Sequence, residues 1–138
     1  MTDDLDTKID AFFARPAFAV AGASTNRDKY GNKVVRAYQQ QGKTVYPLNP
    51  RAEQVEGVVA YPSVDALPAT DIGLSIVTPP AVTAEVVDRA LERGVRHFWM
   101  QPGSENEEAI ARAEQAGATV IHGGPCALVA LGYRESQG

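Results

Sequence analysis

A unit of amphipathic helix, glycine and short strand recurs along the chain, and this repeat limits the fold more than any other feature. It occurs three times, with apolar stripes over residues 34–38, 82–91 and 109–113. A glycine ends each stripe, and a β-branched or aromatic run follows it, over residues 43–48, 95–100 and 118–122 respectively. Glycine adopts the left-handed conformation that ends a helix, and such runs favour buried strands. Strands that alternate with helices pair in parallel through right-handed crossovers.

Further strands and a leading helix complete the prediction. Strands are predicted over residues 18–21 and 71–77, with a short one over 58–60, and the leading helix lies within residues 1–16. The strands are apolar on both faces, so helices must cover both sides of the sheet. We therefore expect one α/β domain over residues 1–138, with a doubly wound parallel sheet in the order 3-2-1-4-5-6. Ser104 and Glu107 form a capping box that predicts the start of the third repeated helix.

Composition excludes several classes of protein. No apolar run approaches the roughly 20 residues of a membrane span, and the acidic N-terminus differs from a signal peptide. The single cysteine, Cys126, excludes an internal disulfide and suits a reducing compartment, and with two histidines it leaves little material for a metal site. A net charge of −4 argues against nucleic acid as a partner. We therefore expect a cytoplasmic protein without membrane or nucleic-acid partners, with a flexible tail over residues 132–138.

The net charge hides an uneven distribution. Between residues 23 and 51, six basic side chains stand against Asp28 alone, a balance of +5, and the rest of the chain carries −9. The basic residues are Arg27, Lys29, Lys33, Arg36, Lys43 and Arg51. Such a cluster either offers a site to an anion or lies by chance on solvated helix faces. Lys33 and Arg36 are expected on the surface of a helix.

The loop over residues 22–31 lies where this fold binds its ligands. In a doubly wound sheet the site is outside the carboxyl ends of the strands, where the strand order reverses, and here the loop meets the turn over residues 78–80. Gly22 lets the chain turn off the first strand, and Ser24 supplies a hydroxyl. The helix that begins near Gly31 offers its first amides and its dipole to a phosphate. The alternative is an ordinary connection between a strand and a helix.

This loop departs from the G-x-G-x-x-G pattern of dinucleotide-binding proteins. Counted from Gly22, Ser24 and Arg27 replace the second and third glycines. The second strand ends in Leu48-Asn49-Pro50-Arg51 instead of the acid that would bind the ribose of NAD. An arginine there favours a ribose with an additional phosphate, as in NADP and coenzyme A. The absence of a G-x-x-x-x-G-K-[ST] motif counts against ATP or GTP in a P-loop.

Seven short motifs occur in order along the chain, over residues 22–24, 29–33, 46–50, 61–63, 78–80, 99–103 and 122–126. In these motifs the sequence resembles the bacterial CoA-binding domain proteins, a family similar to the N-terminal CoA-binding domain of the succinyl-CoA synthetase alpha subunit. The resemblance covers nearly the whole chain, from about residue 9 to residue 131. It implies a Rossmann-like domain that holds CoA across the carboxyl edge of its sheet.

The resemblance also implies which residues contact CoA. The diphosphate would lie against Gly22, Ala23, Ser24 and the loop that follows, with Arg27, Lys29, Tyr30 and Gly31. The adenosine end would lie near Asn49, Pro50 and Arg51, and the pantetheine arm along Thr78, Pro79, Pro80 and the segment that contains Met100. Gln101 joins this set through its position at the end of a strand.

These inferences predict a small cytosolic protein that binds CoA or an acyl-CoA and is noncatalytic by itself. The sequence has no counterpart of the synthetase's second domain or of the histidine that is phosphorylated there. Two alternatives stay open. One is a small NADP-binding reductase, and the other is a CoA-binding subunit that completes an acyl-CoA ligase in trans and therefore needs a protein partner.

Cys126 has two interpretations at the start of the last helix, predicted over residues 127–131. A thiol at a helix N-terminus can act as a nucleophile or redox group, here with His122 as its base. The ordinary alternative, a small buried residue that packs the helix, is favoured because free cysteine is among the most buried residue types.

Overall fold

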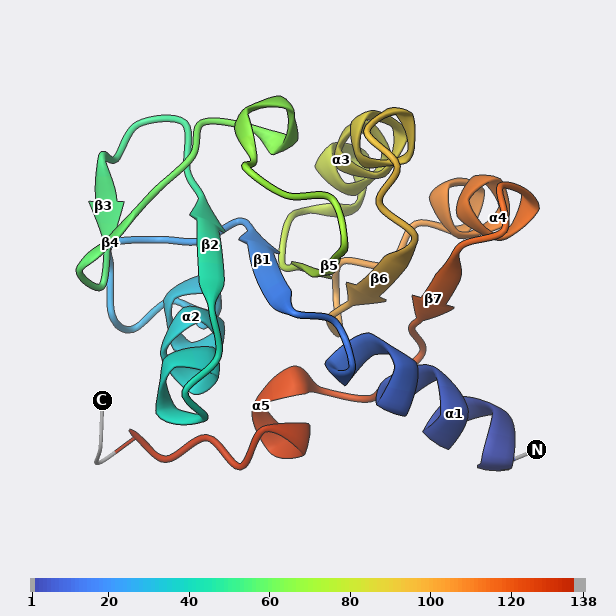
Figure 1. Ribbon diagram of the computed structural model, residues 1–138, viewed down its shortest axis with the longest axis horizontal. Helices are drawn as coiled ribbons and strands as arrows, with labels where there is room; N and C mark the ends of the chain where they lie inside the picture. Colours follow the sequence, from blue (N-terminus) through green and yellow to red (C-terminus); the bar gives the residue numbers. More distant parts are fainter. Residues whose placement is uncertain (1, 136–138) are drawn as a thin grey trace.

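Five parallel strands form the central sheet, in the order β2-β1-β5-β6-β7 (Figure 1). The structure, a computed structural model, describes residues 2–135. The strands are β1 (Ala17–Ala21), β2 (Val45–Leu48), β5 (Ile72–Ile76), β6 (His97–Met100) and β7 (Thr119–Ile121). From β1 the chain extends the sheet to β2 on one side and to β5, β6 and β7 on the other, so the strand order reverses beside β1. The predicted doubly wound α/β fold, Rossmann-like and in one domain, is confirmed.

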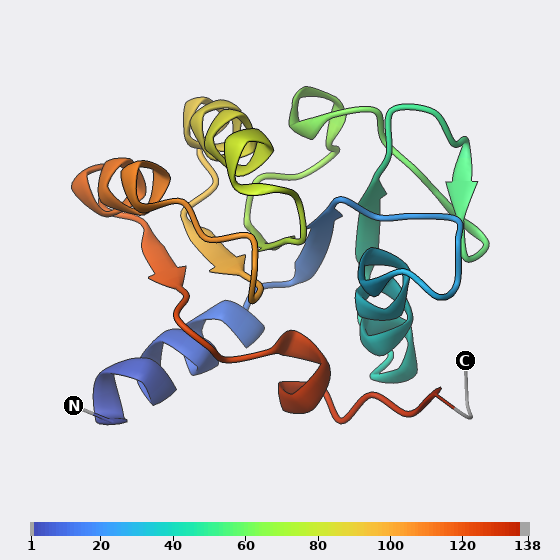
Figure 2. The same cartoon turned by 180° about the vertical axis from the view of Figure 1, so that it is seen from behind.

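Helices cover both faces of this sheet, as Figure 1 and Figure 2 show from opposite sides. One face carries α1 (Thr2–Phe13), α2 (Tyr30–Gln40) and α5 (Ala127–Ala130), and the other carries α3 (Pro80–Glu92), α4 (Glu107–Gln115) and the 3-10 turn η1 (Val64–Ala66). Alternate residues of β1 serve the two faces, since Phe18 and Val20 pack with α2 whereas Ala19 packs in the core beside α3. Among the described residues, no helix combines the length and apolar character needed to cross a membrane.

Close packing fixes α1 and α2 on the sheet. Tyr38 of α2 stacks on Phe18 with ring centroids 4.8 Å apart, and its hydroxyl is 2.6 Å from Ser75 Oγ on β5. Phe12 of α1 lies so close to β5 that a Cβ on Gly73 would come within 2.7 Å of its ring. The stacking of Tyr38 on Phe18 therefore holds α2 against β1.

The prediction of a third strand in the sheet is wrong. β4 (Val58–Val59) pairs antiparallel with β3 (Gln54–Val55) in a separate hairpin, so the sheet has the order 2-1-4-5-6 in the predicted numbering. A parallel neighbour of β2 needs a crossover of roughly a dozen residues or more, and the stretch between Leu48 and Val58 is too short to include a helix. After the hairpin, Tyr61 forms one isolated parallel bridge with Leu48.

The start of α4 also differs from the expectation. Asn106, not Ser104, caps α4, because its side chain accepts a hydrogen bond from Ala109 N (3.0 Å), and Asn is among the strongest N-caps. Residues 132–135 lie against α2, where Gln40 and Arg134 exchange two hydrogen bonds. The rest of the predicted tail, residues 136–138, and residue 1 of the leading segment lie outside the described residues.

Candidate functional site

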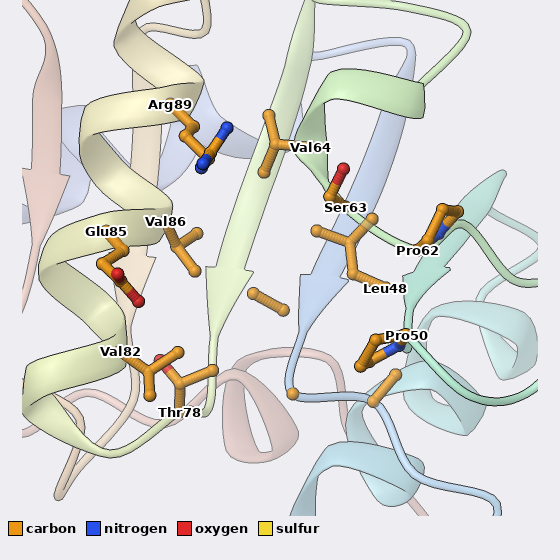
Figure 3. A pocket seen from close by; sticks show the side chains of 13 residues that line it. Leu48, Pro50, Pro62, Ser63, Val64, Thr78, Val82, Glu85, Val86 and Arg89 are labelled. Atoms are coloured by element: carbon orange, nitrogen blue, oxygen red, sulfur yellow. The ribbon is translucent and has the colours of Figure 1, made fainter.

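Two clefts open at the carboxyl edge of the sheet and meet at Thr78, in the turn between β5 and α3. The first has a volume of about 380 Å³ and lies between α3 and the segments that follow β1 and β2 (Figure 3). The second has a volume of about 460 Å³ and is lined by Tyr30, Val77, Thr78, Pro79, Pro102, Gly103, Ser104 and Cys126. One extended ligand could therefore follow the sheet edge from the first cleft to the second.

The walls of the first cleft are mostly apolar. Figure 3 shows Val82 and Val86 of α3 facing Leu48 and Pro50 across the opening. The other lining residues are Ala21, Gly22, Ala23, Pro62, Ser63, Val64, Thr78, Glu85 and Arg89. Apolar walls with a few polar groups at the rim suit a flat organic ring system.

Gly22 and Gly31 bring the first strand and α2 unusually close together. Gly22 has a φ of +91°, and a Cβ on Gly31 would come within 2.0 Å of the Gly22 carbonyl oxygen. The N-terminus of α2 therefore packs directly on the loop that leaves β1. In dinucleotide-binding folds the third glycine of the fingerprint permits this close packing of helix and strand. Gly31 permits the same close packing here, but it lies farther from Gly22 than the third glycine of G-x-G-x-x-G does. A comparison with that pattern therefore did not identify its role.

Side-chain donors hold three backbone carbonyls of the loop between β1 and α2. The pairs are Asn49 Nδ2 with Ala23 O (3.0 Å), Asn32 Nδ2 with Ser24 O (2.9 Å) and Arg36 Nη2 with Arg27 O (2.7 Å). Two of the donors, Asn32 and Arg36, come from α2, and one comes from the end of β2. The path of this loop is therefore set by elements on both sides of it.

These contacts leave two loop amides available to a ligand. In a planar trans peptide the N–H points away from the C=O, and the chain has no cis peptide bonds among its described residues. The amides of Ser24 and Thr25 thus point away from Asn49 and Asn32, and no described residue accepts a hydrogen bond from either. Ser24 Oγ accepts from Asn26 N (3.0 Å), which leaves its proton able to donate. The loop therefore offers three donors and suits an anion.

Residues 16–132 match a family model described as CoA binding domain. This chain belongs to the CoA-binding domain family. The alpha subunit of acetate–CoA ligase [ADP-forming] II from Pyrococcus furiosus is 38% identical over 90 residues, which cover 64% of this chain but only 20% of that subunit. Uncharacterized protein YneT of Bacillus subtilis is 30% identical over 103 residues, which cover 75% of this chain and 76% of that protein.

Solved structures carry the same fold. A hypothetical protein from Pyrococcus horikoshii OT3 has a TM-score of 0.83 and 28% identity, with 91% of this chain and 87% of that chain covered. The dinucleotide forming acetyl-coenzyme A synthetase 1 of Ca. Korarchaeum cryptofilum has a TM-score of 0.73 and 29% identity, with 83% of this chain and 27% of that chain covered. The fold thus occurs both in chains of similar length and as part of much larger chains.

In this CoA-binding domain, Arg36 is buried, so the expectation of a surface position is wrong. It is 5% exposed, and its Nε donates to Asn32 Oδ1 (2.7 Å). Asn32 is fully buried, and its Nδ2 donates to Ser24 O in the loop. A buried guanidinium is tolerated because these acceptors satisfy it. The sequence did not predict either Asn32 or Arg36 as a site residue. Their i, i+4 spacing beside the apolar stripe of α2 could have indicated that both lie on its inner face.

The other basic residues separate into four groups. Lys43 lies just before β2, on the opposite edge of the sheet, with Nζ 5.5 Å from the centre of the Phe18 ring. Lys33 of α2 is half-buried and forms an ion pair with Glu135 (3.8 Å). Arg27, in the loop, forms an ion pair with Glu56 (3.7 Å). Lys29 and Arg51 are exposed at the carboxyl edge, and no ion pair to either is formed by residues 2–135.

Asn49 acts as a bridge between the segments that follow β1 and β2. Its Nδ2 holds Ala23 O, and its Oδ1 accepts from Arg51 N (2.8 Å) and Ala52 N (2.9 Å). These bonds fix the turn that presents Pro50 to the first cleft. Arg51 itself lines neither cleft.

Some of the residues predicted to contact the pantetheine arm are buried inside the protein. Pro79 lines the second cleft, and Pro80 is exposed as the first residue of α3. Met100 is fully buried in the core, and Gln101 is fully buried as well. The Gln101 Oε1 accepts from Tyr30 Oη (2.9 Å) and Ala127 N (2.8 Å), and its Nε2 has no partner. Gln101 therefore ties α2 and α5 to the end of β6 and lines neither cleft.

Cys126 is half-buried in the wall of the second cleft. Its Sγ is 2.6 Å from Tyr30 Oη, whereas His122 is exposed. Burial and the contact with Cys126 raise the pKa of Tyr30, so this phenol stays neutral near pH 7. Trp99 Nε1 donates to Pro125 O (3.0 Å) and anchors the segment before the cysteine. The partner of Cys126 is thus a neutral hydroxyl instead of an imidazole base. No group of three or more His, Cys, Asp or Glu side chains within the described range could hold a metal ion.

Proposed function

We propose that this CoA-binding domain binds coenzyme A or an acyl-CoA along the carboxyl edge of its sheet and is noncatalytic by itself. The observation that carries the proposal is the pair of unpartnered amides at Ser24 and Thr25, which point away from Asn49 and Asn32 in the loop that leads into α2. Backbone amides and the positive end of a helix dipole together stabilise phosphate oxygens. They are the expected partners of the CoA diphosphate, with Gly22, Ala23 and Gly31 allowing its close approach.

The remaining parts of CoA follow from the two clefts. The adenine ring would lie between the apolar walls of the first cleft, next to Pro50. Arg51 and Lys29 are exposed at this edge of the sheet and have no ion pair among the described residues, and we propose that they meet the 3′-phosphate. The pantetheine arm would pass Thr78 and Pro79 and bring the thiol or acyl group into the second cleft. Met100 and Gln101 would support this path from beneath rather than touch the ligand.

A second candidate function is a CoA-holding component of an acyl-CoA ligase, with catalysis supplied by a protein partner. It is favoured by the likeness to the Pyrococcus furiosus ligase subunit, of which this chain spans about a fifth. The cytoplasmic location remains a prediction. A small NADP-binding reductase also remains an alternative, and the titration below separates it from CoA binding.

Calorimetric titration with CoA, dephospho-CoA, NADP and NAD, each at two salt concentrations, tests the proposal. CoA should bind most tightly, and dephospho-CoA more weakly because it lacks the 3′-phosphate. The difference between them should shrink at high salt, since screening weakens contacts between exposed charges. Tighter binding of NADP than of CoA would overturn the assignment.

A further inference from the structure

Glu56 occupies a backbone conformation that its residue type disfavours. It is the first residue of the two-residue turn between β3 and β4, with a φ of +51°, and Gly57 follows with a φ of +80°. Hairpin turns with two positive φ angles favour Asn-Gly or Asp-Gly. Within the described range, Glu56 is the one residue other than glycine with a positive φ. Such outliers persist where the surroundings hold them in place, often next to functional sites.

The residues that hold Glu56 in place belong to α2 and to the loop between β1 and α2. Gln39 Nε2 donates to the Glu56 carbonyl (3.0 Å), and Asn32 Nδ2 donates to its Oε2 (2.9 Å). The other carboxylate oxygen is 3.7 Å from the Arg27 guanidinium, and the side chain is only 17% exposed. The hairpin therefore directs this carboxylate at the underside of the loop, outside both clefts.

We propose that Glu56 is a positioning residue for the phosphate-binding loop, an inference that rests on the proposed function. The Asn32 amide group donates both to Glu56 and to Ser24 O, while its oxygen accepts from Arg36. The carboxylate thus fixes which way the Asn32 amide faces. That orientation holds the Ser24 carbonyl and so aims the Thr25 N–H at the ligand. The same carboxylate keeps Arg27 next to the loop.

A carboxylate near a phosphate site has an opposing effect, and the two effects must be separated. Removal of a negative charge raises the affinity for an anion through the long-range field. Glu53 lies in the same segment, is exposed and forms no ion pair with any residue in the range 2–135. Glu53→Gln therefore removes the same charge without touching the loop and serves as the matched control.

The decisive variant is Glu56→Asn, because asparagine suits this turn better than glutamate does. Relief of backbone strain should offset much of the cost of the lost hydrogen bond, so its melting temperature should stay close to that of the unchanged protein. Loss of the carboxylate should nevertheless weaken CoA binding by about tenfold, as expected for a lost charged hydrogen bond. Glu56→Gln, whose amide oxygen can still accept from Asn32, should show a smaller loss. A defect of general stability would instead lower melting temperature and affinity together.

Loop order gives a second readout that needs no ligand. NMR order parameters of the backbone amides from Ser24 to Asp28 should be near 0.85 in the unchanged protein and in Glu53→Gln, and should fall toward about 0.6 in Glu56→Asn. The proposal is overturned if Glu56→Asn matches Glu53→Gln in both loop order and CoA affinity. If the unchanged protein does not bind CoA at all, the proposed function fails, and the order parameters still decide whether Glu56 positions the loop.

Discussion

The two edges of the central sheet are made from the same repeat of helix, glycine and strand, but among the described residues only the carboxyl edge includes glycines packed against the backbone of other segments. At the amino edge, Gly42, Gly94 and Gly117 have positive φ angles, and a Cβ on any of them would meet nothing within 4 Å. At the carboxyl edge, Gly22 and Gly31 lie against the backbone of neighbouring segments. The first set only lets the chain turn, whereas the second lets two segments approach each other and a ligand.

Two arginines, one from each end of the sheet, show a similar contrast. The Arg15 guanidinium at the amino edge pairs with the largely exposed Asp71 (2.7 Å). Arg36 is buried and donates its hydrogen bonds to Asn32 and to the loop between β1 and α2. We therefore expect Arg15 to be replaceable, whereas Arg36 maintains the shape of the loop.

Gly31→Ala should give the largest effect. Its Cβ would overlap the Gly22 carbonyl, so the free energy of unfolding should fall by about 3 kcal/mol and CoA binding should be lost. Gly117→Ala, with open space around its Cβ, should cost only about 1 kcal/mol for the left-handed conformation and leave binding intact. Urea unfolding and calorimetry measure both quantities. Equal costs for the two variants would contradict the distinction between the edges.

Arg36→Met should destabilise the protein by about 2 to 3 kcal/mol, because it leaves Asn32 Oδ1 and the Arg27 carbonyl without their donor. The matched change at the amino edge, Arg15→Met, should cost about 0.5 kcal/mol, as exposed ion pairs contribute little. Thermal unfolding combined with CoA titration would show a loss of affinity for the first variant only. A comparable loss of CoA affinity in Arg15→Met would show that the effect of Arg36→Met does not arise from its contact with the loop.

Arg51→Ala should narrow the difference in affinity between CoA and dephospho-CoA by about fivefold, in line with roughly 1 kcal/mol for an exposed charge on a phosphate. Lys43→Ala removes a cation from the same basic stretch but from the opposite edge, so the difference should persist. Titration of both ligands against both variants tests this. An unchanged difference in Arg51→Ala would remove Arg51 from the site.

His97, at the amino end of β6, should give the smallest effect. Burial, and next the Arg15 guanidinium, lower the pKa of His97, whose Nδ1 has no partner. Below pH about 6.5 the unfolded chain then binds more protons at this position than the folded chain, so the free energy of unfolding falls as the pH drops. His97→Gln should reduce that fall between pH 7.5 and 5.5 in urea unfolding, and an unchanged fall would contradict the role of His97.

The repeat along the chain was enough to predict the alternating elements, the parallel pairing and the edge at which the two clefts open. It was not enough for residues 54–59, because short β-branched runs do not show whether their partner is the main sheet or each other. The chain does return in parallel beside β2, but only at Tyr61, one residue beyond the predicted run, where it forms a single bridge with Leu48. The two-residue turn at Glu56-Gly57 pairs residues 54–55 with 58–59 before that point.

Individual site residues depend on depth, which a linear pattern does not report. Arg36 looks like a surface residue by type, but acceptors from the loop make its burial favourable. Met100 and Gln101 end a strand at the correct edge, yet α5 and Tyr30 cover Gln101. Gly22, Ala23, Pro50 and Thr78 could be predicted as cleft residues because backbone position alone places them.

The side-chain amide of Gln101 also bears on the order in which the protein folds. One oxygen binds the first residue of α2 and the first residue of α5, which lie 71 positions before it and 26 positions after it. Contacts between such distant positions form late, since long loops must close before they are made. The start of α2 therefore gains its final support only after the last helix has docked, and a chain still emerging from the ribosome would hold a nearly complete sheet without a finished second cleft.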